Sequence, residues 1–190
     1  AVNGGGLLTL QYVKPGYPSV QRQAKVPWQG FSPVQDVVMV PYDAQVTFVN
    51  TASSEPFQVA RGNPVSDSSG ARQATLLFPQ GTQARMTLPD GSTRPLPPLN
   101  VRATEFTVGA SGPAAMPAPL PPSSAYTYCV DLSVDEAVAA GADNVTFDRP
   151  VYFYVDNFLN LPAGTIVPVG YYDRKRGVWV PSKNGRVVKI

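Results

Sequence analysis

The sequence contains no histidine and only one cysteine, and these absences exclude much of the chemistry that hydrolases use. Histidine is the commonest general base and metal ligand, so no Ser-His or Cys-His nucleophile pair can form. Cys129 stands alone, which rules out a disulfide within the chain and a thiolate metal cluster. We interpret Cys129 as a small apolar side chain on a strand and expect no enzymatic activity.

Charged residues are also scarce, at 15% of the chain with a net charge of +2. Apart from Arg174-Lys175-Arg176 the basic residues are scattered, so the sequence lacks the basic stripe that nucleic-acid binding requires. No run approaches eighteen apolar residues, and we expect no membrane insertion. The carboxylate pairs Asp131/Asp135 and Asp143/Asp148 match no calcium loop, and we interpret them as caps of helices and turns. The expected cofactor content is none.

What the sequence does have is short β-branched and aromatic runs, separated by 21 prolines and 16 glycines. That distribution predicts an all-β protein, a β-sandwich of the immunoglobulin-like kind with one short helix, preceded by a small β unit. The expected strands are 7–13, 19–26, 36–41, 45–49, 56–60, 73–78, 83–88, 100–108, 125–132, 144–147, 150–156, 165–169, 178–181 and 186–190.

The helix is expected at 133–141, where Ser133 would cap the N-terminus, Glu136 would complete a capping box and Gly141 would stop it. The proline-rich stretch 109–124 is interpreted as a long extended loop. Asp90-Gly91 and Asn184-Gly185 each predict a two-residue hairpin turn, and the last thirty residues suggest a β-meander.

Polar and turn residues at 50–56 place a domain boundary there. The expected domains are a small β unit over 1–50 and a β-sandwich over 51–190. The chain begins and ends in strand-like patterns, so we expect it to have been excised or processed from a longer polypeptide.

Two groups of residues are candidates for contacts with partners. Strand packing is the favoured role of the C-terminal aromatic residues, with carbohydrate or protein binding as the alternative, through Tyr152, Tyr154, Tyr171, Tyr172 and Trp179. The N-terminal strand could complete the sheet edge of a neighbour as a strand donor, through Leu7, Leu8, Leu10 and Tyr12.

The C-terminal run from Pro150-Val-Tyr-Phe-Tyr-Val155 to Ile190 resembles the region that precedes the repeats in bacterial Rhs/YD-repeat proteins. Segments 72–92, 26–31 and 36–41 resemble the same region. Phe78-Pro79-Gln-Gly81 is similar to the β-sandwich domain of ankyrins and netrin receptors, and the 1–50 unit resembles the end of a carboxypeptidase-regulatory-like β domain. Some relatives of that sandwich cleave themselves at a His-Phe-Ser site, which this His-free chain lacks.

The resemblance implies a non-enzymatic structural or spacer module of a large exported surface or secreted protein, located outside the cell or on its surface. Its partners would be neighbouring domains of the same polypeptide or other copies of itself. One alternative is a self-assembling extracellular filament subunit joined by N-terminal strand addition. The other is an adhesin-like carbohydrate- or protein-binding module.

Overall fold

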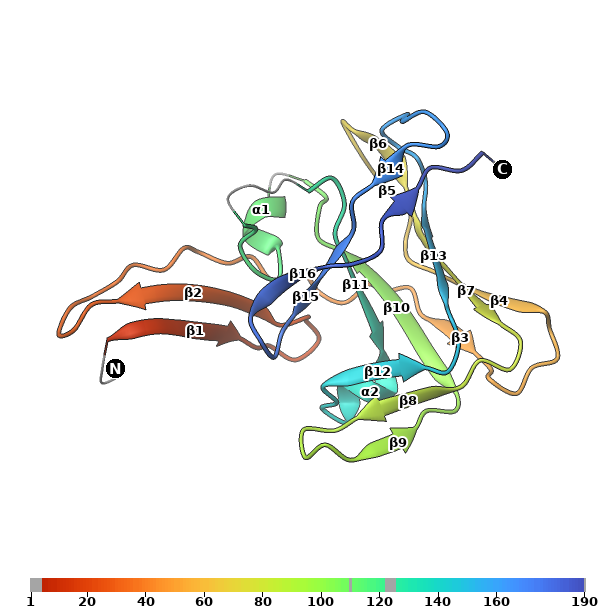
Figure 1. The fold of residues 1–190 in the computed structure, drawn as a ribbon, viewed down its shortest axis with the longest axis horizontal. Helices are drawn as coiled ribbons and strands as arrows, with labels where there is room; N and C mark the ends of the chain where they lie inside the picture. Colours follow the sequence, from red (N-terminus) through yellow and green to blue (C-terminus); the bar gives the residue numbers. More distant parts are fainter. Residues whose placement is uncertain (1–4, 110, 122–125, 190) are drawn as a thin grey trace. The chain divides into compact units, whose positions relative to one another are not determined.

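The computed structural model describes residues 5–109, 111–121 and 126–189 (Figure 1). The described chain is an all-β protein of small antiparallel sheets, as the sequence predicts. It divides into two compact units, each built from segments far apart in the sequence. Unit 1 comprises Ala1–Pro41, Phe106–Cys129 and Leu161–Ile190, and unit 2 comprises Tyr42–Glu105 and Val130–Asn160. The stretch 50–56, expected as a domain boundary, falls inside unit 2.

Unit 1 is made of hairpins and one helical turn. Its elements are β1 (Gly6–Tyr12), β2 (Val20–Val26), α1 (Gly112–Ala115), β14 (Ile166–Val167), β15 (Gly170–Asp173), β16 (Val178–Pro181) and β17 (Gly185–Arg186). β1 and β2 pair along their whole length, with Leu10 opposite Arg22. β15 pairs with β16, and β14 pairs with β17 around that hairpin, so the C-terminal strands are nested hairpins instead of a meander.

Unit 1 contains a small cluster of buried apolar residues. Phe106, Ala115 and Met116 are buried there, and Cys129 and Trp179 are among the half-buried side chains that pack against them. Cys129 therefore serves as the small apolar side chain that the sequence suggests, although it lies just before a strand and not on one.

Unit 2 contains three three-stranded sheets, β11-β10-β3, β12-β8-β9 and β13-β7-β4, and the β5-β6 hairpin. The elements are β3 (Thr47–Val49), β4 (Phe57–Arg61), β5 (Val65–Asp67), β6 (Gly70–Arg72), β7 (Ala74–Pro79), β8 (Ala84–Thr87), β9 (Thr93–Pro95), β10 (Leu99–Glu105), β11 (Val130–Val134), α2 (Asp135–Ala139), β12 (Asn144–Phe147) and β13 (Tyr152–Val155).

The core of unit 2 follows the two-residue period of its strands. β7 buries Ala74, Leu76 and Phe78 and leaves the alternate side chains half-buried. The Phe78 ring meets the Phe147 ring edge to face, with centroids 5.7 Å apart, and so joins two of the sheets. β10 also contacts β4, which brings the third sheet to the same core.

Several local predictions are wrong. Segment 36–41 forms no strand, and its Val38 N–H donates to the carbonyl of Ala114. Helix α1 lies within the stretch expected to be fully extended. Asn184-Gly185 does not close a two-residue hairpin, because β17 pairs with β14 and Gly185 is not among the glycines with positive φ in the described chain. Residues 125 and 190, the ends of two expected strands, lie outside the described residues.

The expected capping box at 133–141 is also wrong in detail. α2 begins at Asp135 with Val134 as its N-cap and has no side-chain cap bond. Ser133 lies on β11 instead, where its buried hydroxyl has no hydrogen-bond partner within the described structure. The strand continues to Val134 because Ser133 stays in register with Arg102 of β10, and this pairing overrides the local helix signal.

Candidate functional site

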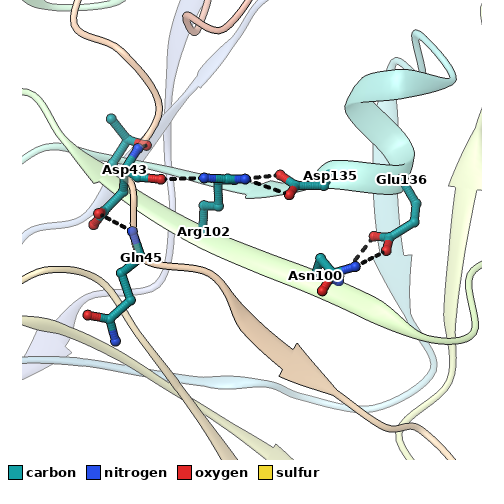
Figure 2. Close-up of polar contacts among 7 residues, drawn as sticks. Asp43, Gln45, Asn100, Arg102, Asp135 and Glu136 are labelled. Carbon is teal, nitrogen blue, oxygen red and sulfur yellow. Dashed lines mark hydrogen bonds and ion pairs between the residues drawn. The ribbon is translucent and has the colours of Figure 1, made fainter.

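A cluster of polar residues in unit 2 is a row of side chains on one face of β10 (Figure 2). Asn100, Arg102 and Thr104 alternate along the strand and therefore project from the same side of the sheet. Each of them binds a segment that covers this face, either α2 or the loop that begins at Tyr42. We call this set the β10 polar row.

Arg102 is the centre of the β10 polar row. Its Nε and Nη2 donate to the two carboxylate oxygens of Asp135 at 2.6 and 2.8 Å, and its Nη1 donates to the Asp43 carbonyl at 2.6 Å (Figure 2). The hydrogen bond to Asp135 raises the pKa of Arg102. This two-point geometry fixes the start of α2 against the sheet.

Asn100 holds the next residue of α2. The backbone N–H and the side-chain amide of Asn100 donate to Glu136 Oε2 and Oε1, at 3.0 and 2.5 Å (Figure 2). Both carboxylate oxygens of Glu136 therefore accept hydrogen bonds from Asn100 of β10, and not from the N-terminus of α2. These bonds explain how a helix of five residues is held in place.

Asp43 closes the other end of the β10 polar row. Its N–H donates to Thr104 Oγ1 at 2.9 Å, and its carboxylate accepts hydrogen bonds from the backbone N–H groups of Gln45 and Asn63 and from the Asn63 amide. The three carboxylates of the cluster accept from specific N–H donors, which suits an architectural role better than proton transfer. Among the described residues, no group of three or more Cys, Asp or Glu residues is arranged to hold a metal ion.

A second polar cluster of unit 2 is centred on Arg72, whose side chain is 2% exposed. It pairs with Asp67 at 2.9 Å and with Glu105 at 2.7 Å. The Phe158 ring lies over the guanidinium, with its centroid 4.7 Å from Cζ. The Arg72 hydrogen bond is the largest cause that lowers the pKa of Asp67 to about 2. This cluster ties the β5-β6 hairpin to the end of β10.

The five aromatic residues proposed for partner binding fall in both units. Tyr152 and Tyr154 lie on β13 of unit 2, whereas Tyr171, Tyr172 and Trp179 lie on the β15-β16 hairpin of unit 1. Tyr172 donates to Gln21 Oε1 at 2.6 Å, and the Trp179 indole N–H donates to the Pro119 carbonyl at 3.0 Å. Their rings lie 5.3 Å apart, so these two side chains pack within unit 1.

Tyr152 and Tyr154 belong to an exposed apolar face of the sheet β13-β7-β4. The register places Tyr152, Leu77 and Val59 side by side, and the alternation adds the other side chains of the same face. We call this surface the β7 apolar face; its apolar residues are Phe57, Val59, Leu77, Pro79, Tyr152 and Tyr154, and the same register places Thr75 and the exposed Arg61 beside Tyr154 at one end of it. Phe57 is 53% exposed, Tyr152 48% and Tyr154 41%. The sequence pattern pointed to the two tyrosines but not to their neighbours on β4.

The opposite side of β13 is only partly buried. Phe153, which alternates with the two tyrosines along the strand, is 42% exposed. The reason is the position of β13 at the edge of its sheet, where only β7 is a neighbour. An edge strand receives less cover from the rest of the core than a central one.

The expected strand-donor residues Leu7, Leu8, Leu10 and Tyr12 all lie on β1. Within the described chain, β1 has β2 as its only strand neighbour, so its other edge carries no further strand. Leu7 is 67% exposed. The strand is therefore already paired on one side and open on the other.

The chain matches no protein-family model, no curated protein and no solved structure. The likeness to Rhs/YD-repeat proteins therefore remains a prediction from the sequence. In the described residues, no helix is long and apolar enough to cross a membrane.

Proposed function

We propose that the chain is a non-enzymatic structural β module of a larger exported surface or secreted protein. Neighbouring domains of the same polypeptide, or other copies of the module, pack against it. The β7 apolar face is the observation that carries this proposal, because contiguous exposed apolar surface on a soluble protein marks a contact with other protein.

Burial of the β7 apolar face by a partner would release a sizeable hydrophobic free energy. Its three aromatic residues are each about half exposed. Since such side chains bury about 150–250 Å² when fully covered, they offer roughly 300 Å², or about 7 kcal/mol of hydrophobic free energy before the cost of association. A covalently linked neighbouring domain avoids most of that cost, which favours a module within a longer chain.

The polar clusters support the non-enzymatic part of the proposal. The carboxylates of the β10 polar row and of the Arg72 cluster accept hydrogen bonds from donors of the same unit. A catalytic carboxylate has to exchange protons with a substrate. Carboxylate oxygens that already accept hydrogen bonds from the protein's own N–H groups are poorly placed for that exchange. The exported location rests on the resemblance to Rhs/YD-repeat proteins alone.

The test compares the isolated chain with the native protein in its source cells by hydroxyl-radical footprinting. We expect Tyr152 and Tyr154 to be oxidised several-fold more slowly in the native protein, while the buried Phe78 stays unreactive in both. Peptides that run past the ends of this sequence would show that the protecting surface belongs to a longer polypeptide. Equal oxidation of the two tyrosines in both samples would refute the proposal.

A pair of variants sharpens the test. Replacing Tyr152 and Tyr154 together by Thr keeps strand propensity but removes the aromatic surface. Tyr171→Thr is the matched control, because Tyr171 is 54% exposed and lies on β15 of unit 1. We expect the double variant, and not the control, to restore fast oxidation of Phe57 within the native protein.

The open edge of β1 favours one alternative, a filament subunit joined by strand addition. β1 is seven residues long, and alternate residues direct their N–H and C=O groups to this edge, where a strand of a second copy could pair. Deleting residues 1–13 should then abolish assembly, as measured by light scattering, while the hydrogen exchange of peptides from unit 2 stays unchanged. Assembly that survives the deletion would exclude this alternative.

The exposed pair Tyr152 and Tyr154 also favours an adhesin-like module, since two aromatic rings on one strand face can stack on a sugar. A glycan-binding profile that survives Ala at both tyrosines would argue against it. Trp179→Ala serves as the comparison, because its indole is engaged with Pro119.

A further inference from the structure

Arg22 of unit 1 is a buried cation held by backbone carbonyls. It is 4% exposed. Its Nη1 donates to the carbonyls of Gln21 at 2.7 Å and Met116 at 3.0 Å, and its Nη2 donates to the carbonyl of Ala114 at 2.7 Å. These bonds use three of the five N–H groups of the guanidinium. The hydrogen bonds of Arg22 within the described chain leave the Nε–H and one N–H of Nη2 unused, and Nε is not among the buried atoms without a partner, so this edge of the guanidinium reaches solvent.

At Arg72 and Arg102 the chain itself supplies a carboxylate to the Nε and Nη2 of the guanidinium. Arg102 uses Nε and Nη2 to bind the Asp135 carboxylate, and Arg72 places the same two nitrogens at 2.7 Å from Glu105 Oε1. Among the described residues, no carboxylate lies within ion-pair distance of Arg22. The Nε and Nη2 of Arg22 could therefore bind a carboxylate in the way that those of Arg72 and Arg102 do, but the described chain places none there.

A hollow of about 270 Å³ lies beside this side chain, entirely within unit 1. It is lined by Arg22, Gln23, Pro33, Val34, Gln35 and Pro119. The lining offers one buried positive charge, two amide side chains and apolar walls. That combination fits a ligand with one charged end and a short apolar body.

We propose that the hollow beside Arg22 binds a small carboxylate, which accepts hydrogen bonds from the Nε and Nη2 of Arg22. The bound carboxylate supplies the counter-charge that the described chain leaves out. Arg22 is 4% exposed and its three acceptors are neutral carbonyls, so a carboxylate bound at two points would add the counter-charge that they lack. Consistent with this, loss of hydration lowers the pKa of Arg22, whereas the hydrogen bonds to their carboxylates raise the pKa values of Arg72 and Arg102.

The nearest acidic residue in the sequence is Asp36, which follows the lining residue Gln35. Asp36 is exposed and makes no ion pair with Arg22 in the structure. A guest carboxylate and Asp36 would compete for the same guanidinium edge. The experiment must therefore distinguish a ligand from this residue of the chain.

The primary experiment titrates acetate into the full chain and follows the arginine Nε–Hε signals by nuclear magnetic resonance, with chloride at equal ionic strength as the control. We expect a saturable shift of the Arg22 signal with half-saturation on the order of 1 mM. The signals of Arg72 and Arg102 should stay fixed, because their Nε atoms already donate to carboxylates. An Arg22 signal that moves no more than these two overturns the proposal.

Two variants complete the test. Arg22→Lys keeps the charge but lacks the fork, and we expect it to weaken acetate binding at least about tenfold, as read from the Gln23 and Gln35 amide signals. Asp36→Asn should bind acetate as the natural chain does. If Asp36→Asn moves the Arg22 signal in the absence of acetate, Asp36 is the partner and the proposal fails.

The source of the carboxylate in the native state follows from dilution. An Arg22 signal that shifts with protein concentration, without acetate, assigns the carboxylate to an acidic side chain of a second copy. An Arg22 signal independent of protein concentration but sensitive to acetate assigns the site to a free small acid. Both outcomes support a carboxylate site, and the wild-type titration does not depend on how well the variants fold.

Discussion

Replacing Arg72 by Leu should destabilise unit 2 more than most surface substitutions destabilise a protein. Arg72 carries one of the most buried charges of the described chain, and it pairs with Glu105, whose side chain is only 7% exposed. Leu restores apolar volume but leaves the Glu105 carboxylate inside the protein without the guanidinium. The contact of the guanidinium with the Phe158 ring is lost as well.

The magnitude follows from the burial of the pair. Removing one partner of a buried ion pair costs about 3–5 kcal/mol, against about 0–1 kcal/mol for an exposed pair. The second partner, Asp67, is 24% exposed, so its contribution is the smaller one. We therefore expect Arg72→Leu to lower the free energy of unfolding by about 3 kcal/mol or more.

The assay is urea unfolding followed by far-ultraviolet circular dichroism, together with hydrogen exchange of peptides from β7 and β10. Both tryptophans, Trp28 and Trp179, lie in unit 1, so their fluorescence reports on the other unit. The double variant Arg72→Leu/Glu105→Leu removes both charges and should be clearly more stable than the sum of the single effects predicts. A single effect below about 1 kcal/mol, or strictly additive effects, would refute the reasoning.

Two further predictions concern pH and backbone packing. The folded pKa of Asp67 is lowered to about 2 from 3.8, so its stabilising contribution is complete above pH 3.8 and is lost as the pH falls toward 2; the melting temperatures of the natural chain and of Asp67→Asn should converge over that interval, and a constant gap would contradict it. In Gly62→Ala the new Cβ would lie 2.6 Å from the Ala103 carbonyl oxygen, which should cost roughly 1–3 kcal/mol by urea unfolding. Gly185→Ala is the control, because its Cβ meets nothing closer than 3.6 Å and its φ is not positive; a cost above about 1 kcal/mol there would indicate the two-residue turn that the structure lacks.

Strands rich in aliphatic, β-branched or aromatic residues were predictable from the sequence even where they are short, and strands with few such residues were not. The expected strands 144–147 and 178–181 coincide with β12 and β16. β5, β6 and β9 were missed because each has three residues and includes Ser, Asp, Gly, Arg or Pro, which carry little strand signal. Such strands form because they pair with the adjacent hairpin strand, β5 with β6 and β9 with β8, and their own residue types do not announce that pairing.

Helix α2 shows how tertiary contacts redirect a correct local signal. The motif around Ser133 and Glu136 located a helix within one or two residues, but the role of each side chain was wrong. Glu136 binds Asn100, which is 36 residues away in the sequence. The alternation Asn100, Arg102, Thr104 is visible in the sequence, yet only the register of β10 with β11 brings Asp135 to Arg102. Candidate polar residues could thus be found from the sequence, while their partners required the fold.

The proposed contact at the β7 apolar face and the proposed carboxylate site at Arg22 depend on different interactions and can be tested separately. The described polar clusters of unit 2 direct their charges toward each other, and the β7 apolar face, with Arg61 at one end, is the surface that we propose a partner covers. Arg22 of unit 1 is the exception, because its guanidinium edge is left for an acceptor that the described chain does not provide. Salt should therefore weaken acetate binding at Arg22 and leave the cover of Tyr152 and Tyr154 unchanged or strengthened. If both respond to salt in the same direction, the separation between an apolar contact and a charged site does not hold.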